Sequence, residues 1–194
     1  MASVGAAAAV VVTVFIGSLQ AHGALAGDRD RPTVVLHVRD FQGVPRTELT
    51  DAQRGASEIY AHIGVRLVWT GGSARLNAVD RCLNVDVVIL DKTMADRNNP
   101  EPAAFGQASH VTRRAYIYYS RIVAYAVRTH SSPDRPLALV LAHELGHVLL
   151  PEYSHTAAGI MRPTFSGPIV KLPRFGSEQA TTIRTAVIGA APID

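Results

Sequence analysis

Residues 137–149 read LALVLAHELGHVL, and this apolar stretch with two embedded histidines predicts a helix. The helix is expected to end just before Pro151, because a proline disfavours helical backbone at the preceding residue. His143 and His147 are four residues apart, so both imidazoles project from one face of the helix. That spacing lets two ring nitrogens bind one zinc ion. Glu144 lies about 100° round the helix and can reach a water molecule beside the metal.

A catalytic zinc site takes three protein ligands and leaves a fourth position for water. His155 lies eight residues beyond His147 and follows the turn at Pro151, so it is the candidate third ligand. The chain has one cysteine, Cys82, which excludes a multi-cysteine zinc ribbon and an intramolecular disulfide framework. A buried thiol is favoured for Cys82 over an inhibitory thiolate. The sequence therefore favours a site built from three histidines.

The rest of the chain alternates short β-branched or apolar runs with helical patterns, which is typical of an α+β or α/β sandwich with one mixed sheet. Thr50 and Ser177 are the expected N-caps of the first and last helices. The strand at 84–90 is nearly all apolar and is expected to be central. Strands are predicted at 33–39, 65–70, 84–90, 103–110 and 114–119, helices at 50–63, 122–128, 137–149 and 177–187, and irregular segments at 96–102 and 151–175.

The first 26 residues contain none of the chain's 19 Lys+Arg or 16 Asp+Glu residues. An apolar run at 6–16 and the small residues at 24–26 predict a signal peptide over 1–26, cleaved after Ala26. An uncleaved membrane anchor is the alternative, and Gln20 and His22 count against it because a spanning helix needs roughly 20 mostly apolar residues. We therefore expect a single domain at 27–194, secreted or periplasmic, that carries the candidate zinc site.

Charge and composition narrow the classes of protein. A net charge of +3 is too small to indicate binding to nucleic acid or to an anionic membrane surface. A hydrophobic content of 47% argues against intrinsic disorder, and 194 residues suit one domain. No nucleic-acid partner is expected, nor a stable membrane association once the leader is cleaved.

The residues at and after the helix resemble the metzincin clan of zinc endopeptidases, and most closely its small matrixin-like bacterial members. The clan pattern is H-E-x-x-H-x-x-G-x-x-H followed by a methionine-containing Met-turn. His143, Glu144 and His147 match this pattern directly, and the segment GIMRP at 159–163 resembles the Met-turn. The resemblance implies that Met161 packs beneath the zinc site without binding the metal.

The sequence departs from the clan pattern after the second histidine. Leu150 stands where the clan has its turn glycine, and His155 comes two residues late. The turn must therefore be made differently, which leaves Glu152 or Tyr153 as alternative third ligands. No tyrosine follows Met161 closely, so the extra tyrosine ligand of some clan members has no counterpart.

The resemblance also implies a fold and a mode of substrate binding. The fold would be a metzincin-like zincin fold: α+β, with a twisted, mixed and mostly parallel sheet, an antiparallel edge strand, an active-site helix, the Met-turn and a C-terminal helix. Substrate would lie extended along the edge strand above the helix. The candidate residues for that strand are Phe105, Gly106, Gln107 and Ala108, and an ordinary loop at 103–109 is the alternative.

These observations predict a secreted zinc-dependent endopeptidase with one catalytic Zn²⁺ and a polypeptide substrate. Peptide bonds would be hydrolysed through a zinc-activated water with Glu144 as general base. One alternative is a catalytically silent zinc-binding module of the same fold that binds a protein partner, and the intact Glu144 argues against it. Another is zinc hydrolysis of a non-peptide substrate such as nucleic acid, which the low charge and the leader disfavour.

Overall fold

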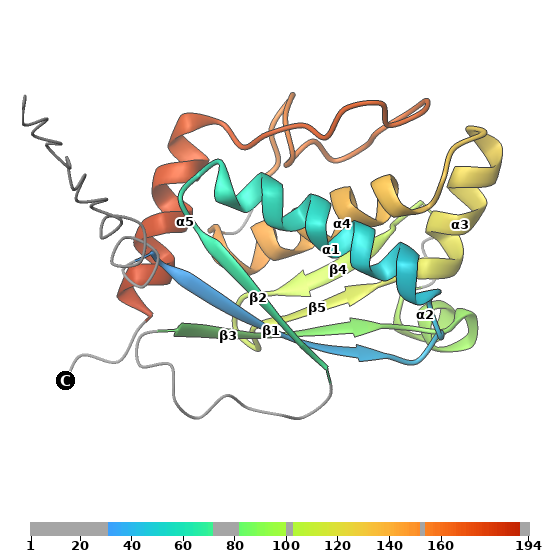
Figure 1. Ribbon diagram of the computed structural model, residues 1–194, viewed down its shortest axis with the longest axis horizontal. Coiled ribbons are helices and arrows are strands. Elements are labelled where there is room, and N and C mark those ends of the chain that lie inside the picture. The colour runs from blue at the N-terminus through green and yellow to red at the C-terminus, as the bar shows by residue number, and fades with distance from the viewer. Residues whose placement is uncertain (1–30, 72–81, 100–102, 152–153, 191–194) are drawn as a thin grey trace, which may run out of the picture. The chain divides into compact units, whose positions relative to one another are not determined.

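The computed structural model describes residues 31–71, 82–99, 103–151 and 154–190. A five-stranded sheet in the order β2-β1-β3-β5-β4 forms the centre of this region, and the long helices lie over one of its faces (Figure 1). The elements are β1 (Thr33–Asp40), α1 (Arg46–Ala61), β2 (Arg66–Gly71), β3 (Cys82–Ile89), α2 (Lys92–Asn98), β4 (Gly106–Ser109), β5 (Arg114–Ile117), α3 (Tyr119–Arg128), α4 (Asp134–Leu149) and α5 (Ser177–Gly189).

The sheet is mixed and mostly parallel, as predicted. Strand β1 pairs in parallel with β2 and β3, and β3 pairs in parallel with β5. Strand β4 is antiparallel to β5 and lies at one edge of the sheet. The apolar β3 is the middle strand, which agrees with the expectation that it is central. Strand β4 is therefore the only antiparallel strand of this five-stranded sheet.

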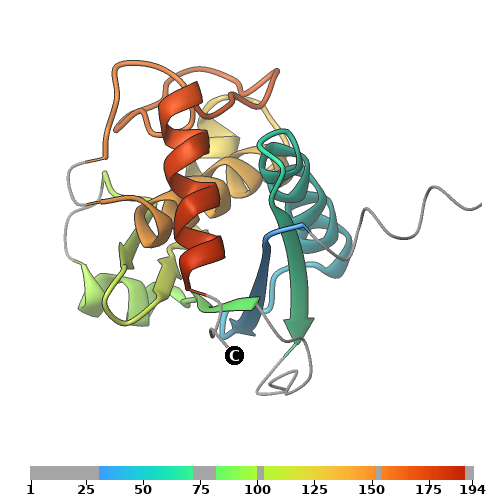
Figure 2. The same cartoon turned by 90° about the vertical axis from the view of Figure 1, so that its left-hand side faces the viewer.

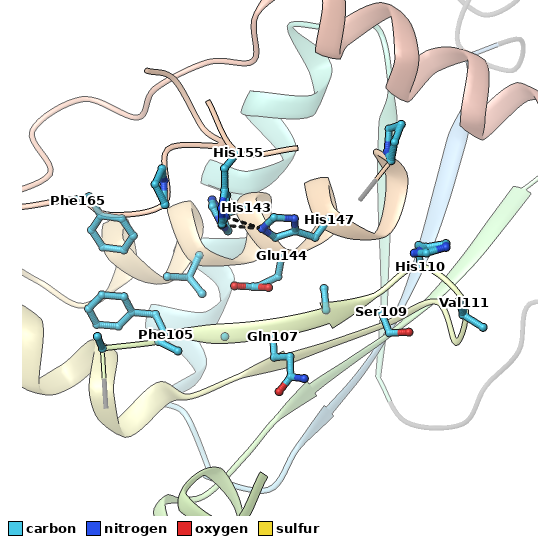
Figure 3. A pocket seen from close by; sticks show the side chains of 17 residues that line it. Phe105, Gln107, Ser109, His110, Val111, His143, Glu144, His147, His155 and Phe165 are labelled. Carbon is cyan, nitrogen blue, oxygen red and sulfur yellow. Dashed lines mark hydrogen bonds between the residues drawn. The ribbon is translucent and has the colours of Figure 1, made fainter. Parts of the chain in front are cut away.

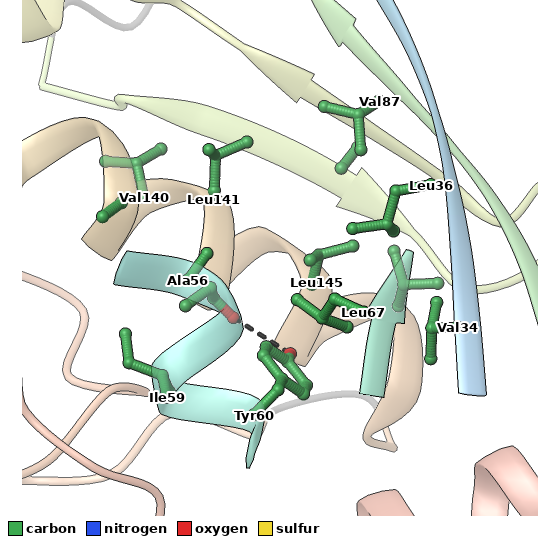
Figure 4. Packing of buried hydrophobic residues seen from close by; sticks show 14 of the residues in the cluster. Val34, Leu36, Ala56, Ile59, Tyr60, Leu67, Val87, Val140, Leu141 and Leu145 are labelled. Carbon is green, nitrogen blue, oxygen red and sulfur yellow. Dashed lines mark hydrogen bonds between the residues drawn. The ribbon is translucent and has the colours of Figure 1, made fainter. Parts of the chain in front are cut away.

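The main core lies between the sheet and helices α1 and α4. Alternate residues of β1, Val34 and Leu36, point toward the helices because successive strand side chains face opposite sides of a sheet. They belong to one buried cluster with Leu141 and Leu145 of α4 (Figure 4). A buried hydrogen bond of 3.2 Å from the Tyr60 hydroxyl to the Ala142 carbonyl ties α1 to α4. These contacts fix α4, the helix that carries the HELGH motif, against the sheet.

Helices α1 and α4 approach closely where both carry small residues. A Cβ atom at Gly55 would lie 2.9 Å from the Cβ of Ala138 and 3.0 Å from Cδ1 of Leu172. The loop after α4 thus packs over the same crossing. Figure 2 shows the C-terminal helix α5 crossing beside α4. Between α4 and α5 the described residues contain no helix or strand, in agreement with the predicted loop.

Three local predictions were wrong, and the strand predicted at 114–119 ends at Ile117, so that α3 already begins at Tyr119. The first helix begins at Arg46 after Pro45, so Thr50 lies inside α1, and its hydroxyl donates to the Arg46 carbonyl at 2.8 Å. The last helix has Gly176 as its N-cap, with Ser177 as the first helical residue. In both cases the helix begins one or more residues earlier than the polar side chain suggested, and the N-cap residue, Pro45 or Gly176, has no side chain that could accept a hydrogen bond.

The third correction concerns residues 96–102, which were predicted to be irregular. Helix α2 covers 92–98, and Asp91 caps it by accepting a hydrogen bond of 2.7 Å from the Met94 amide. Lys92 and Asp96 are paired across one turn at 2.6 Å. The helix covers a small second apolar cluster that includes Val88 and Tyr118. It is only seven residues long, so its hydrophobic period is too short to recognise.

The predicted leader, residues 1–26, lies outside the described residues. Within the part of the chain that is described, no helix is long and apolar enough to cross a membrane. The signal peptide, its cleavage after Ala26 and the division of the chain at residue 27 stay predictions.

Candidate metal centre and active site

Three histidine side chains converge beside α4. The Nε2 atom of His147 lies 3.0 Å from Nε2 of His143 and 3.0 Å from Nε2 of His155 (Figure 3). Helix α4 supplies the first two, one turn apart, and the segment after the helix returns to supply the third. Three nitrogens bound to one tetrahedral zinc at 2.0–2.1 Å would lie about 3.3 Å apart. The spacing of the three rings therefore suits a single small metal ion.

The imidazole rings of His143 and His147 are oriented by hydrogen bonds to their Nδ1 atoms, on the side of each ring that faces away from the cluster. His143 Nδ1 lies 2.8 Å from the carbonyl oxygen of Ile160, and a carbonyl can only accept, so Nδ1 carries the proton. This leaves the lone pair of His143 on Nε2, the atom that faces the other imidazoles. The Ser154 hydroxyl oxygen lies 3.2 Å from Nδ1 of His147, where that nitrogen can donate to it. Such partners fix the tautomer and direction of metal-binding histidines.

The same environment keeps the two helical imidazoles neutral. Burial lowers the pKa of His143, and the neighbouring His155 lowers it further. Burial and the two other imidazoles lower the pKa of His147 to about 4. At neutral pH both rings are therefore unprotonated, which is the form that binds a metal ion. The donor set, its spacing and its protonation all fit a zinc ion, which His143, His147 and His155 would hold.

Met161 lies against α4 within the candidate site. Its side chain is completely buried, and a Cβ atom at Gly146 would collide with its sulfur. The Thr156 amide donates to the Met161 carbonyl at 2.9 Å, and Gly159 has a φ of 81°, a conformation that favours glycine. The turn thus brings Met161 and the Ile160 carbonyl to the helix together. The supporting role that the resemblance assigns to Met161 stays a prediction.

Truncating Met161 is expected to destabilise the fold. Met161→Ala should lower the free energy of unfolding by about 2–5 kcal/mol, because it leaves a cavity against α4. Met161→Leu keeps most of the volume and should cost less than about 1.5 kcal/mol. Urea denaturation of the parent and both variants measures the difference. Equal losses for alanine and leucine would contradict the packing role.

Glu144 is a buried carboxyl group that faces the edge strand. Its side chain is only 6% exposed, and burial raises the pKa of this carboxyl to about 8. In Figure 3 its carboxylate lies below the histidines, on the side toward β4. Burying an unpaired ionised carboxylate costs free energy and does not help a protein to fold. A buried glutamate next to a candidate metal site therefore indicates a functional residue.

The raised pKa of Glu144 predicts how the stability of the metal-free protein depends on pH. Between pH 4.5 and about 8 the unfolded chain has this carboxyl ionised, whereas the folded chain keeps it protonated. Stability therefore falls as pH rises through that window. Glutamine cannot ionise, so Glu144→Gln should gain stability over the parent by an amount that grows with pH, to at most about 5 kcal/mol.

Urea denaturation of both proteins in the presence of a chelator, at the two ends of the window, measures this gain. A difference between parent and Glu144→Gln that does not change with pH would show that Glu144 ionises normally in the folded protein.

A cleft of about 620 Å³ is lined by residues of α4, of β4 and of the loop after α4, and it contains the candidate site. Phe105 and Phe165 stack at 5.0 Å between ring centroids at one end of it, and each meets Tyr125 edge-on. Ser109 and His110 line the other end (Figure 3). Sequence reasoning gave no role to His110 or Phe165, because neither has a recognisable spacing from the motif.

The residues predicted for the substrate strand lie along this cleft. Gly106, Gln107 and Ala108 belong to β4, and Phe105 directly precedes it. The segment is a strand at the sheet edge and not an ordinary loop. The Tyr118 amide donates to the Phe105 carbonyl at 2.9 Å, which extends the pairing with β5 by one step. Whether a substrate binds along it stays a prediction.

Among the described residues, Cys82 and His37 take no part in the candidate site. Glu152 and Tyr153, the alternative third ligands, fall outside the described residues. Cys82 was expected to be buried and is half-buried at the start of β3, where burial raises the pKa of its thiol. His37 hydrogen-bonds with Asn84 at 2.8 Å within the sheet and takes no part in the cluster of imidazoles.

Comparison with known proteins gives limited similarity. No family model matches the sequence, and no curated protein matches it. Similar solved structures include archaemetzincin from Archaeoglobus fulgidus in complex with malonate, at 18% identity and a TM-score of 0.43, over 77% of this chain and 99% of that one. Archaemetzincin from Methanopyrus kandleri is 16% identical with a TM-score of 0.44, over 80% and 96% of the two chains. These values do not assign the chain to a family.

Proposed function

We propose that this protein is a zinc-dependent endopeptidase of the metzincin type, with one catalytic zinc ion. The observation that carries the proposal is the convergence of three imidazole Nε2 atoms beside the buried Glu144, in a cleft that faces an edge strand. Zinc bound there would supply Lewis acidity to the scissile carbonyl and to water. His143, His147 and His155 would hold it, and Met161 would support the helix beneath them.

Glu144 would move the proton in this reaction. It would accept the proton of the attacking water and deliver it to the leaving amine. In the metal-free protein burial raises the pKa of this carboxyl to about 8, so its carboxylate form is a stronger base than that of an exposed glutamate.

The edge strand would bind the substrate backbone. In an antiparallel pair, residues that exchange hydrogen bonds alternate with residues that do not. The Phe105–Tyr118 bond sets this alternation, so the peptide groups of Gly106 and Ala108 face away from β5. They are free to pair with an extended polypeptide laid in the cleft. The proposed substrate is therefore a chain in extended conformation.

We further propose that the protein acts outside the cytoplasm after removal of residues 1–26, as the leader sequence suggests. The matrixin-like bacterial type, suggested by the segment at 143–163, belongs to the same proposal. The silent zinc-binding module remains the second candidate, and the same experiment decides between the two.

The test is a peptide library incubated with zinc-loaded protein and read by mass spectrometry. We expect cleavage at internal peptide bonds, loss of cleavage with a chelator and recovery when zinc is restored. No cleavage from protein that carries a full equivalent of zinc would contradict the proposal and favour the silent module.

A further inference from the structure

Gly106, the first residue of β4, touches the side chain of Glu144. A Cβ atom built at position 106 would lie 2.6 Å from Cγ of Glu144, and 2.7 Å from both its Cδ and Oε1. Carbon atoms that are not bonded approach to about 3.5–4.0 Å at their optimum. The Glu144 side chain therefore fills the space that the side chain of any other residue at 106 would need.

The backbone conformation at Gly106 does not itself require glycine. Positive φ angles among the described glycines occur at 43, 64, 159 and 167, and not at 106. A glycine inside a strand weakens it and often marks a close approach by another group. At position 106 that group is the carboxylate of the buried Glu144.

Neither side of this contact can easily move away. Strand β4 is held to β5 on either side of Gly106, by the hydrogen bond from the Tyr118 amide to the Phe105 carbonyl and by the pairing of Gln107 with Tyr116. The Tyr118 hydroxyl also hydrogen-bonds to Gln107 at 3.2 Å. On the other side, α4 is fixed by the completely buried Leu145 in the main core. A side chain at 106 would therefore displace the Glu144 carboxylate before it displaced the strand or the helix.

We propose that Gly106 is a positioning residue that holds the Glu144 carboxylate beside the three imidazoles. The role of Gly106 in catalysis rests on the proposed function, whereas the contact between Gly106 and the Glu144 side chain does not depend on it. Gly106 also presents its peptide group to the free edge of the sheet, so the backbone that would bind substrate is the same backbone that positions the base. A substrate paired there would lie directly over Glu144.

The first test is a crystal structure of metal-free Gly106→Ala beside that of the parent. We expect the Glu144 carboxylate to be displaced by about 1 Å or more, with the three histidines in place. Gly71→Ala is the matched control, since Gly71 is also a strand glycine and no atom of the described residues lies within 4 Å of a Cβ added there. An unmoved Glu144 carboxylate in Gly106→Ala would overturn the proposal, whatever the protein's activity.

If Gly106→Ala fails to fold, a double variant still tests the proposal. Removing the Glu144 side chain removes the obstacle, so Gly106→Ala combined with Glu144→Ala should fold. If the double variant also fails to fold while Glu144→Ala alone folds, the glycine serves the strand and not Glu144.

The second test is kinetic and uses the zinc-loaded protein. Gly106→Ala should lower kcat at least about 100-fold, the cost expected of a displacement near 1 Å, with zinc content and KM nearly unchanged. Gly71→Ala should keep the parent's kcat. A kcat within threefold (about half a decade) of the parent would overturn the proposal. A parent without activity would instead refute the proposed function, and the crystallographic test would still decide the role of Gly106.

Discussion

Replacing Glu144 with glutamine is expected to lower kcat for peptide hydrolysis by about 10²–10⁴-fold while zinc remains bound. Glutamine has nearly the same shape but cannot accept the proton of the attacking water. Since Glu144 makes no part of the histidine cluster, its replacement should leave the three Nε2 atoms where they are. Initial rates on a cleaved library peptide and zinc content by elemental analysis measure the two effects.

The control for this variant is Glu58→Gln, which changes an exposed glutamate on α1 in the same way and should keep the parent's rate. If zinc-loaded Glu144→Gln cleaved as fast as the parent, Glu144 would not be the general base. The higher stability of Glu144→Gln at higher pH would still show that the Glu144 carboxyl group is buried in the parent.

Replacing His155 with alanine is expected to weaken zinc binding by more than about 100-fold. Loss of a partner outside the coordination shell already costs 10–100-fold, and His155 would be one of only three protein ligands. Its ring is the exposed member of the cluster, so the fold should tolerate the change. Competition with a chromophoric chelator measures the affinity, and activity at limiting zinc should fall in parallel.

His62→Ala is a suitable control, because His62 is an exposed histidine at the end of α1, away from the cleft. Unchanged zinc affinity in His155→Ala would mean that another group completes the site. Glu152 and Tyr153, which the altered spacing after Leu150 left open, would then be the next residues to replace.

The sequence was most informative where periodicity and chemistry coincide. Thirteen residues of α4 combine an apolar helical pattern with two histidines one turn apart, so the helix and its zinc-facing side could both be predicted. The return of His155 followed from the broken turn at Pro151. The mixed sheet was also expected. Its antiparallel edge strand was implied by the family resemblance, and the central place of β3 followed from its apolar sequence.

What the sequence did not reveal are contacts between residues far apart along the chain. The Ile160 carbonyl that orients His143 is a backbone group, and Ser154 is one hydroxyl among many in a loop. The contact of Gly106 with Glu144 joins positions that no local pattern connects. A glycine inside a predicted edge strand was the available signal, but its partner is visible only once β4 and α4 are packed together.

Anomalous diffraction at the zinc absorption edge, from crystals of the zinc-loaded protein, shows whether His143, His147 and His155 together hold one zinc ion. We expect a single zinc peak about 2.0–2.1 Å from the Nε2 atom of each of the three histidines. A zinc ion bound elsewhere, or bound to the two helical histidines without His155, would refute the proposed metal centre.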